Sequence, residues 1–422
     1  MNTQGESGNT YASDALYNTV GNIIYFFCLW IITVLVVRLS GYEDAGILSV
    51  AMTTSNMFFV VANYGMRSFQ ASDITDEYSN QQYILSRYVT VGSGVIMCLI
   101  FSAISHYVGV QFYAIQTFML FKAIEAFSDV LFGVMQRGHQ MKFTGISLAA
   151  KGLLSVVGFI VGILVTGELI WALILMLVFS TLVLFLYDVP KTSLIDQKAF
   201  ALASADLSRS FHLLRSCFAM FLVSVAPMIL QAIPKLSFER IYSTEELGIY
   251  SSVASPTVVL STLVSCIMIP YLPMFAKAIA SEDRKGLFKL FAAFIGLVLI
   301  FGILACLATW LFGGWALSFL YGNDMYAYTR LFAWVICSVT LTNLLYCLNA
   351  LFISGRKIPL LALVYICADI VCYLIAEPLI RARGIYGITD ALNITQLLQC
   401  IVLGILCIPL FFRAKQKHPF HA

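Results

Sequence analysis

Three charged residues and one amide lie in or next to a stretch that is otherwise apolar enough to cross a membrane. Lys122, Glu125, Asp129 and Gln136 occur in or just beyond residues 112–135. At about 100° per residue on a helix, the four positions fall within about 60° of one another and form one polar stripe. A lone charge at the centre of a bilayer costs about 2.5–3.5 kcal/mol and normally faces protein or a watery cavity. The stripe therefore indicates a path for a charged or sugar-like solute.

The composition is that of a polytopic membrane protein. The chain is 60% hydrophobic and only 11% charged, whereas a soluble globular protein is about 25% charged. Twelve apolar segments are long enough to span a bilayer. They cover residues 15–38, 46–66, 84–106, 111–135, 143–166, 170–188, 214–237, 248–272, 288–311, 328–353, 359–380 and 388–412. We expect an all-α fold with no room for a soluble catalytic domain.

Lysine and arginine residues are distributed unevenly between the two sides of these spans. With both termini inside, the inner loops and the tail carry 17 of them and the outer loops carry five, while three lie within spans. Positive charge collects in cytoplasmic loops, so we expect both termini in the cytoplasm. Residues 1–14 contain no lysine or arginine and lack the basic region of a signal peptide, so we expect the first span to be retained.

An internal repeat divides the twelve spans into six and six. Residues 38–49 align without gaps on residues 240–251, and five of the twelve positions are identical. The identities are Arg38/Arg240, Glu43/Glu245, Gly46/Gly248, Ile47/Ile249 and Ser49/Ser251. Gly138 and Gly355 occupy a second pair of equivalent turns. An even number of spans per half makes the repeats parallel, about an axis along the membrane normal. The repeat predicts two pseudo-symmetric six-helix lobes around a central cavity, a chance match being the alternative.

The repeat and the loops divide the chain into four segments. We expect an N-terminal six-helix lobe over residues 1–188 and a cytoplasmic linker over residues 189–213. A second six-helix lobe covers residues 214–412, and a basic cytoplasmic tail covers residues 413–422.

Four segments give the chain a resemblance to a known transporter family. They are residues 41–46 (GYEDAG), 63–73 (NYGMRSFQASD), 125–137 (with EAFSD and QR) and 234–250 (with PKLSFER and ELGIY). Over residues 18–412 the chain resembles the flippases of the multidrug/oligosaccharidyl-lipid/polysaccharide exporter superfamily that act on polysaccharide precursors. Lipid II flippases look similar but usually carry fourteen spans, two more than this chain can hold.

This resemblance implies a flippase of the O-antigen or capsule type. Such a protein moves oligosaccharide repeat units linked to undecaprenyl pyrophosphate across the bacterial cytoplasmic membrane, by alternating access, for surface polysaccharide synthesis. Its partners would be the lipid-linked oligosaccharide, membrane lipids, a polysaccharide polymerase and glycosyltransferases, with no nucleic acid. A drug or cation antiporter of the same superfamily is the main alternative, and it would favour a cavity dominated by acidic residues.

The resemblance also implies two sets of site residues. Cations replace water around a diphosphate, arginine as a bidentate fork and lysine as a point charge, while carboxylates bind sugar hydroxyls or a coupling proton or sodium ion. For the diphosphate and glycan we expect Lys122, Lys151, Lys235, Arg67 and Gln136, with Arg87 beside Arg67 at the inner mouth. As coupling or cavity acids we expect Glu125, Asp129 and Asp369.

Several of these residues also have a structural alternative. Lys122 could neutralise a neighbouring acid in a buried ion-pair cluster, whereas Lys151 has no evident partner in the sequence. Lys235 lies near an outer span end, where it could extend to the interface beside Glu239. Asp129 could make a hydrogen bond between packed helices.

Enzyme activity is not expected. The chain has no GxxxxGK[ST] phosphate-binding loop, its five histidines lie in loops, span edges or the tail, and its eleven cysteines show no metal-ligand spacing. A polymerase would need a large outer loop with catalytic residues, and the longest outer stretch, residues 315–328, offers only Asp324 as an acid. We therefore expect a transport protein with no cofactor and no bound structural metal.

Overall fold

The structure is a computed structural model that describes residues 3–73, 77–201, 206–268, 271–281, 283–355 and 357–412. Within these ranges the chain is helical and forms no β-strand, which confirms the predicted all-α class. The chain divides into two compact units, Met1–Pro256 and Thr257–Ala422. The predicted basic tail lies outside the described residues.

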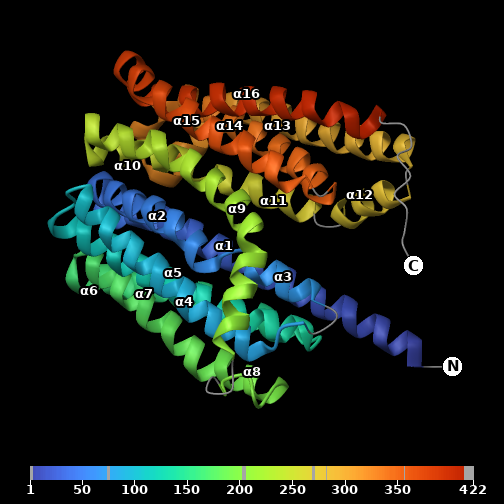
Figure 1. The fold of residues 1–422 in the computed structure, drawn as a ribbon. Coiled ribbons are helices and arrows are strands. Elements are labelled where there is room, and N and C mark those ends of the chain that lie inside the picture. The colour runs from blue at the N-terminus through green and yellow to red at the C-terminus, as the bar shows by residue number, and fades with distance from the viewer. Residues whose placement is uncertain are drawn as a thin grey trace. The chain divides into compact units, whose positions relative to one another are not determined.

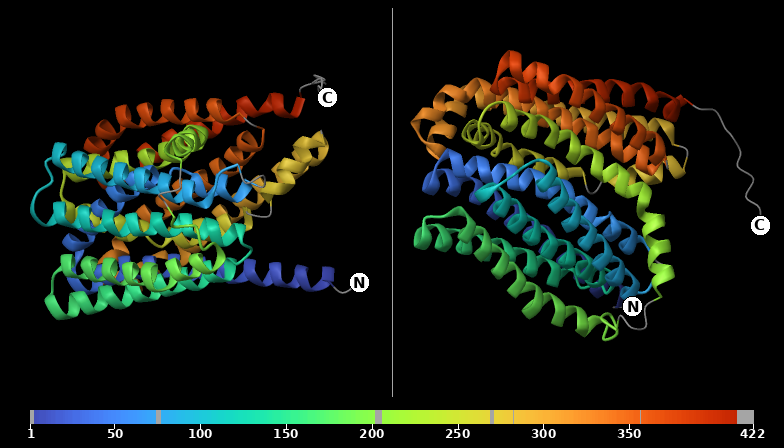
Figure 2. Two further views of the ribbon diagram at one scale, coloured as in Figure 1. Left: turned by 60° about the horizontal axis from the view of Figure 1, so that its bottom comes forward. Right: turned by 60° about the vertical axis from the view of Figure 1, so that its left-hand side comes forward.

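The first unit extends from α1 to α10 (Figure 1). Its elements are α1 (Thr3–Ser40), α2 (Tyr42–Asn63), α3 (Met66–Ser72), α4 (Asn80–Ile104), α5 (Gly109–Arg137), α6 (Met141–Thr166), α7 (Leu169–Val183), the π-helical turn η1 (Leu184–Asp188), α8 (Val189–Ile195), α9 (Leu207–Ile241) and α10 (Thr244–Ala254). Helix α6 packs against both α1 and α7, and α2 packs against α4, α5, α9 and α10. Figure 2 shows α6 and α7 side by side.

Helices α1 and α6 approach each other closely because glycines face each other at their contact. A Cβ atom on Gly21 would lie 2.1 Å from the Gly145 carbonyl oxygen, and one on Gly145 would lie 2.2 Å from the Tyr17 carbonyl oxygen. Membrane helices associate through such small residues, since lipid provides no hydrophobic drive between helices. This packing fixes α6, which carries Lys151, against the rest of the unit.

The second unit extends from α11 to α16. Its elements are α11 (Thr257–Met268), α12 (Tyr271–Ala280), α13 (Arg284–Tyr321), the 3₁₀ turn η3 (Asn323–Tyr328), α14 (Thr329–Ser354), α15 (Ile358–Arg383) and α16 (Ile385–Phe412). Helix α14 packs against α13 and α16, and α16 also packs against α15.

Helices α14 and α16 are joined by polar contacts spaced about one turn apart. Trp334 Nε1 donates to Asp390 Oδ1 over 2.6 Å. Ser338 Oγ donates to Asn393 Oδ1 over 2.6 Å, and Gln396 Nε2 donates to Thr342 Oγ1 over 2.9 Å. Side-chain hydrogen bonds between membrane helices replace water that lipid cannot supply.

Eleven of the twelve predicted spans each coincide with one continuous helical segment of the structure. Ten helices among the described residues are long and apolar enough to cross a membrane. Helix α5 is as long, but it carries the charges of Lys122, Glu125 and Asp129. The predicted span over residues 248–272 is divided, because α10 ends at Ala254 and α11 begins at Thr257. Pro256 lies at the break and cannot donate a helical hydrogen bond.

The repeat reappears in the way equivalent helices end. The residue that ends α5, Gly138, has φ −76° and ψ 5°, and the residue that ends α14, Gly355, has φ −79° and ψ 5°. After these glycines, the Gln140 amide donates to the Met135 carbonyl and the Lys357 amide donates to the Phe352 carbonyl, each over 2.8 Å. The two turns are equivalent in sequence and in backbone geometry, as the repeat predicts.

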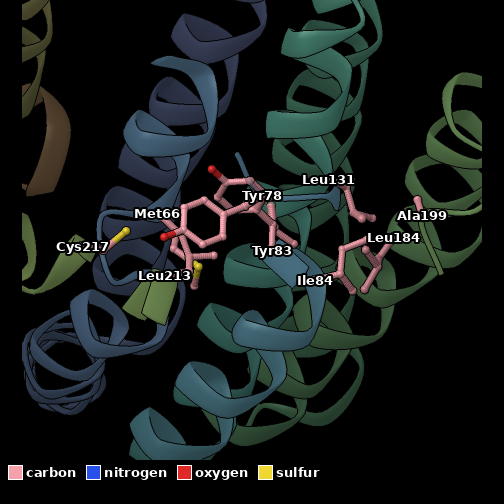
Figure 3. Close-up of a cluster of buried hydrophobic side chains, with 10 residues drawn as sticks. Met66, Tyr78, Tyr83, Ile84, Leu131, Leu184, Ala199, Leu213 and Cys217 are labelled. Atoms are coloured by element: carbon pink, nitrogen blue, oxygen red, sulfur yellow. The ribbon is translucent and has the colours of Figure 1, made fainter. Parts of the chain in front are cut away.

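The predicted linker is held against the first unit where it is described. Ala199 is fully buried in a core cluster with Leu184, Leu213 and seven other residues (Figure 3). Asn80 Nδ2 donates to Asp196 Oδ2 over 2.9 Å, which ties the start of α4 to this segment. The contacts place α9 and α10 in the first unit, although the repeat assigns them to the second lobe. The lobe boundaries at 188 and 214 stay predictions.

Candidate functional site

Helix α5 carries the predicted polar stripe, and its first two charges pair with each other. Lys122 Nζ lies 2.8 Å from Glu125 Oε2, one helical turn away, and both side chains are largely buried. The ammonium group also lies 5.3–5.6 Å from the ring centres of Phe59, Phe118 and Phe121. Aromatic faces attract a desolvated cation. Lys122 is thus enclosed by its acid and three rings, which favours the structural alternative for this residue.

Asp129, further along α5, is bound by two arginines. Its Oδ1 lies 3.4 Å from Arg67 Nη1 on α3, and its Oδ2 lies 3.1 Å from Arg87 Nη2 on α4. Arg87 also donates to the Ala62 and Asn63 carbonyl oxygens over 2.7 Å each, and to Asn63 Oδ1 over 3.0 Å. These carbonyls lie at the end of α2, where a helix leaves its last acceptors without partners.

The position of Arg87 corrects the sequence interpretation. Arg87 does not flank an open mouth, because its side chain is fully buried. Arg67 keeps 28% of its side chain exposed, so it is the accessible member of the pair. Asp129 therefore joins α3, α4 and α5 around a buried guanidinium group.

Lys151 on α6 has a partner that the sequence did not suggest. Its Nζ lies 2.5 Å from Asp188 Oδ2 at the end of η1, and the two side chains are 1% and 0% exposed. Lys151 also donates to Ser128 Oγ, and it lies 5.2 Å from the Phe132 ring centre. The π-helical turn adds a residue to the backbone coil and so re-aims the side chains that follow it. The pair links α6 to the end of the α7 segment through a buried charge.

Lys235 on α9 differs from the other cations predicted for the site. No carboxylate of the described residues lies within 4 Å of its ammonium group. Glu239, one turn further, accepts from Gln111 Nε2 over 3.1 Å and from Thr244 Oγ1 over 3.4 Å. Lys235 is half-buried, so it offers a positive charge with no acid bound to it in the described part of the chain.

The face of α9 that bears Lys235 is partly polar. Gln231 and Ser224 precede Lys235 by four and eleven residues, which places them within about 40° of it around the helix. Gln231 is exposed and Ser224 is half-buried. A polar face on a membrane helix normally borders protein or water, because lipid cannot satisfy its groups.

Asp369 lies in the second unit, on α15, and is half-buried. Its Oδ1 accepts no hydrogen bond from the described residues. One turn earlier, the Tyr365 hydroxyl accepts from Asn349 Nδ2 over 2.7 Å. Asp369 thus remains a carboxylate without a paired cation in the part of the chain that is described.

Residues at the end of α5 contact the loop that connects α3 and α4. Gln136 is half-buried in the last turn. Its neighbour Arg137 donates to the Tyr78 carbonyl over 3.2 Å and to Asn80 Oδ1 over 3.3 Å, and it lies 3.9 Å from Asp73 Oδ2. Arg137 therefore fixes the connection between α3 and α4, of which residues 74–76 lie outside the described residues.

Asp73 is the acceptor at the centre of this loop. Burial raises the pKa of Asp73, but three hydrogen-bond donors and one nearby positive charge outweigh that effect and hold the pKa below its ordinary value. The donors are the backbone amides of Glu77 and Tyr78 and the Tyr83 hydroxyl, and the charge is the Arg137 guanidinium group, 3.9 Å away. The Asp73 carboxylate therefore contributes stability above its unfolded pKa, and this contribution is lost as the pH falls through the lower folded pKa.

A pocket of about 330 Å³ lies beside the same loop. It is lined by Glu77, Tyr78, Ser208, Arg209 and His212. The Tyr78 hydroxyl and His212 Nδ1 are 2.6 Å apart. The pocket is separate from the α5 stripe, and its lining residues come from the loop before α4 and the first turns of α9.

Comparisons with known proteins agree with this architecture. The polysaccharide biosynthesis protein family matches residues 12–279. The capsular polysaccharide biosynthesis protein CapF of Staphylococcus aureus is 24% identical over 318 residues, which cover 73% of this chain and 76% of CapF.

Solved structures of multidrug transporters share the fold. An inward-facing MATE family transporter of the MOP superfamily aligns with a TM-score of 0.70 at 13% identity, over 94% of each chain. The multidrug transporter DinF-BH aligns with a TM-score of 0.65 at 15% identity, over 96% of this chain and 97% of DinF-BH. A mutant of the Vibrio cholerae MATE transporter VcmN aligns with a TM-score of 0.60 at 12% identity, over 98% of this chain and 100% of VcmN. The chain is a multi-pass membrane protein with the MOP transporter fold, and it belongs to the polysaccharide biosynthesis protein family.

Proposed function

We propose that this protein translocates oligosaccharides linked to undecaprenyl pyrophosphate across the bacterial cytoplasmic membrane by alternating access. The family match and the likeness to a capsular polysaccharide protein support the substrate class. The MOP fold supports transport rather than enzymatic chemistry. In this proposal both termini lie in the cytoplasm, as the distribution of lysine and arginine predicts.

The observation that best supports the proposal is the charge of Lys235, which has no acid partner in the described part of the chain. Lys122, Lys151 and Arg87 each have an acid within 3.1 Å, so a diphosphate would compete with that acid for them. An ammonium group without a counter-ion is unfavourable in a membrane helix, and a phosphate oxygen would neutralise it. We assign one diphosphate contact to Lys235, with Arg67 as the other accessible cation.

The three predicted acids can also be separated by whether a cation is bound to them. Glu125 and Asp129 are already bound by cations, whereas Asp369 has no cation bound to it among the described residues. Among the three predicted acids, Asp369 is therefore the best candidate to take up a coupling proton or sodium ion. A drug or cation antiporter is the second candidate function, because an unpaired carboxylate on a multidrug-transporter fold would also bind a cationic drug.

A charge series at Lys235 tests the assignment. We expect Lys235→Gln to lower the export of surface polysaccharide by about tenfold to a hundredfold, since a hydrogen bond to a charged group contributes about 1.5–3 kcal/mol. Lys235→Arg should retain most of the export, and Lys235→Glu should abolish it. The measurement is surface polysaccharide per cell, normalised to the amount of protein in the membrane.

Lys198→Gln is the matched control, because Lys198 is exposed in the segment between α8 and α9. It removes the same charge and should leave export unchanged. Wild-type export in Lys235→Gln would exclude Lys235 from the diphosphate site.

A further inference from the structure

The two copies of the sequence repeat touch each other in the folded chain. A Cβ atom on Gly46 of α2 would lie 1.8 Å from the Thr244 carbonyl oxygen, and one on Gly248 of α10 would lie 2.0 Å from the Tyr42 carbonyl oxygen. Tyr42 and Thr244 are themselves equivalent in the repeat, and each is the first residue of its helix. The contact is therefore reciprocal, as at a two-fold interface where residue i meets j and j meets i.

A third pair of repeated residues, Ser49 and Ser251, also meets in this contact. Ser49 Oγ and Ser251 Oγ are 2.6 Å apart and share one hydrogen bond. Ser49 is 7% exposed and lies about 10 Å along α2 from its first residue, at 1.5 Å per residue. The contact thus extends from the helix ends about two turns along α2.

Two further hydrogen bonds join the two halves of the chain at this end. Gln111 Nε2 at the start of α5 donates to Thr244 Oγ1 over 2.7 Å. Arg240 Nη2 at the end of α9 donates to Ser105 Oγ after α4 over 3.1 Å. These residues surround the glycine contact, and the described residues form no ion pair across it.

This contact can separate without breaking an ion pair of the described residues. Its repeated residues are glycine and serine, which allow close backbone approach, while α10 also buries the apolar side chains of Leu247, Tyr250 and Val253. By contrast, the contacts that hold α2 against α4 and α5 run through the buried charges of Arg87 and Asp129. The first half of the chain should therefore move as one body, and α10 should move away from it.

We propose that the contact of α2 with α10 at Gly46, Gly248, Ser49 and Ser251 is a gate that is closed in this structure. The inference rests on the proposed function, since a gate at one end is what alternating access requires. The distribution of lysine and arginine predicts that this end lies on the outer side of the membrane. Opening separates α10 and the part of α9 after Pro227, an internal proline where a helix can bend.

A reversible cross-link tests the gate. In Ser49→Cys/Ser251→Cys, oxidation with copper phenanthroline should form a disulfide, detected by mass spectrometry, and should reduce export to the level of cells without the protein. Reduction with dithiothreitol should restore export. The two single cysteine variants, oxidised in the same way, are the controls for the native cysteines and should export normally. Normal export by the fully cross-linked double variant would show that the contact is static and would overturn the proposal.

A second readout does not depend on the transported substrate. Alkylation of Ser49→Cys by a membrane-impermeant maleimide reports the opening of the gate from outside. Adding Gly248→Ala should accelerate alkylation several-fold, because the methyl group has no space when the gate is closed. Adding Gly92→Ala, at a glycine with open space around it, should not. Equal rates in both variants would overturn the gate, whereas accelerated alkylation without any polysaccharide export would overturn the proposed substrate and leave the gate in place.

Discussion

Arg87→Gln is expected to remove most of the protein from the membrane. The substitution leaves Asp129 with Arg67 alone, it removes the Arg87 donor from the Asn63 carbonyl oxygen, and it leaves the Ala62 carbonyl oxygen with the Thr90 hydroxyl as its donor. Breaking a buried ion pair by removing one partner costs about 3–5 kcal/mol. Thermal unfolding of the detergent-solubilised protein and its level in the membrane measure the effect. Arg87→Lys should not rescue stability, because an ammonium group cannot reproduce the planar fork.

Arg381→Gln is the matched control for this prediction. Arg381 pairs with Glu377 over 2.8 Å, but the two side chains are 62% and 59% exposed. Exposed pairs contribute at most about 1 kcal/mol, so the unfolding midpoint should barely move. An Arg87→Gln protein as stable as wild type would show that the α2, α3, α4 and α5 contacts do not depend on this guanidinium group.

The second large effect is expected at the pair of Lys151 and Asp188. Lys151→Met should leave a buried carboxylate alone, and Asp188→Leu should leave a buried ammonium group alone, each costing about 3–5 kcal/mol. The double variant should recover most of the stability, because a well-packed apolar pair often replaces a buried ion pair without loss. A double-mutant cycle of thermal unfolding measures the coupling.

The same cycle separates structure from transport. If Lys151→Met is as stable as wild type but fails to export polysaccharide, Lys151 acts on the substrate, as the sequence alone suggested. If the double variant is stable and exports normally, the pair positions α6 against the α7 segment and does not contact the diphosphate. We expect the second result.

Much of the fold could be predicted from the sequence because membrane spans are long and apolar, and their pattern is read locally. The repeat was visible for a related reason. Gly46 and Gly248 are required where two backbones approach closely, and Gly138 and Gly355 end equivalent helices. The break at Pro256 was missed because hydropathy averages across it.

The pairing of the charges could not be predicted. Lys151 and Asp188 are 37 residues apart, and they meet only because α6 packs along α7 and η1 turns the Asp188 side chain inward. The sequence predicts that Asp129 shares one face of α5 with Lys122 and Glu125. Its partners come from α3 and α4, and no local sequence pattern predicts how these helices pack. The sequence suggests Glu239 as a neighbour for Lys235. Only the structure shows that Glu239 is bound to Gln111 instead.

Reconstitution into liposomes shows whether the transported species is a lipid that carries a pyrophosphate-linked glycan. The purified protein is placed in vesicles that contain a fluorescent oligosaccharide linked to a polyprenyl pyrophosphate, and an impermeant quencher reports the glycans that reach the outer leaflet. We predict movement of the pyrophosphate-linked glycan in wild-type vesicles, and its loss with Lys235→Glu. Export of a cationic dye driven by a proton or sodium gradient, with no movement of the lipid-linked glycan, would contradict the account and identify a cation antiporter.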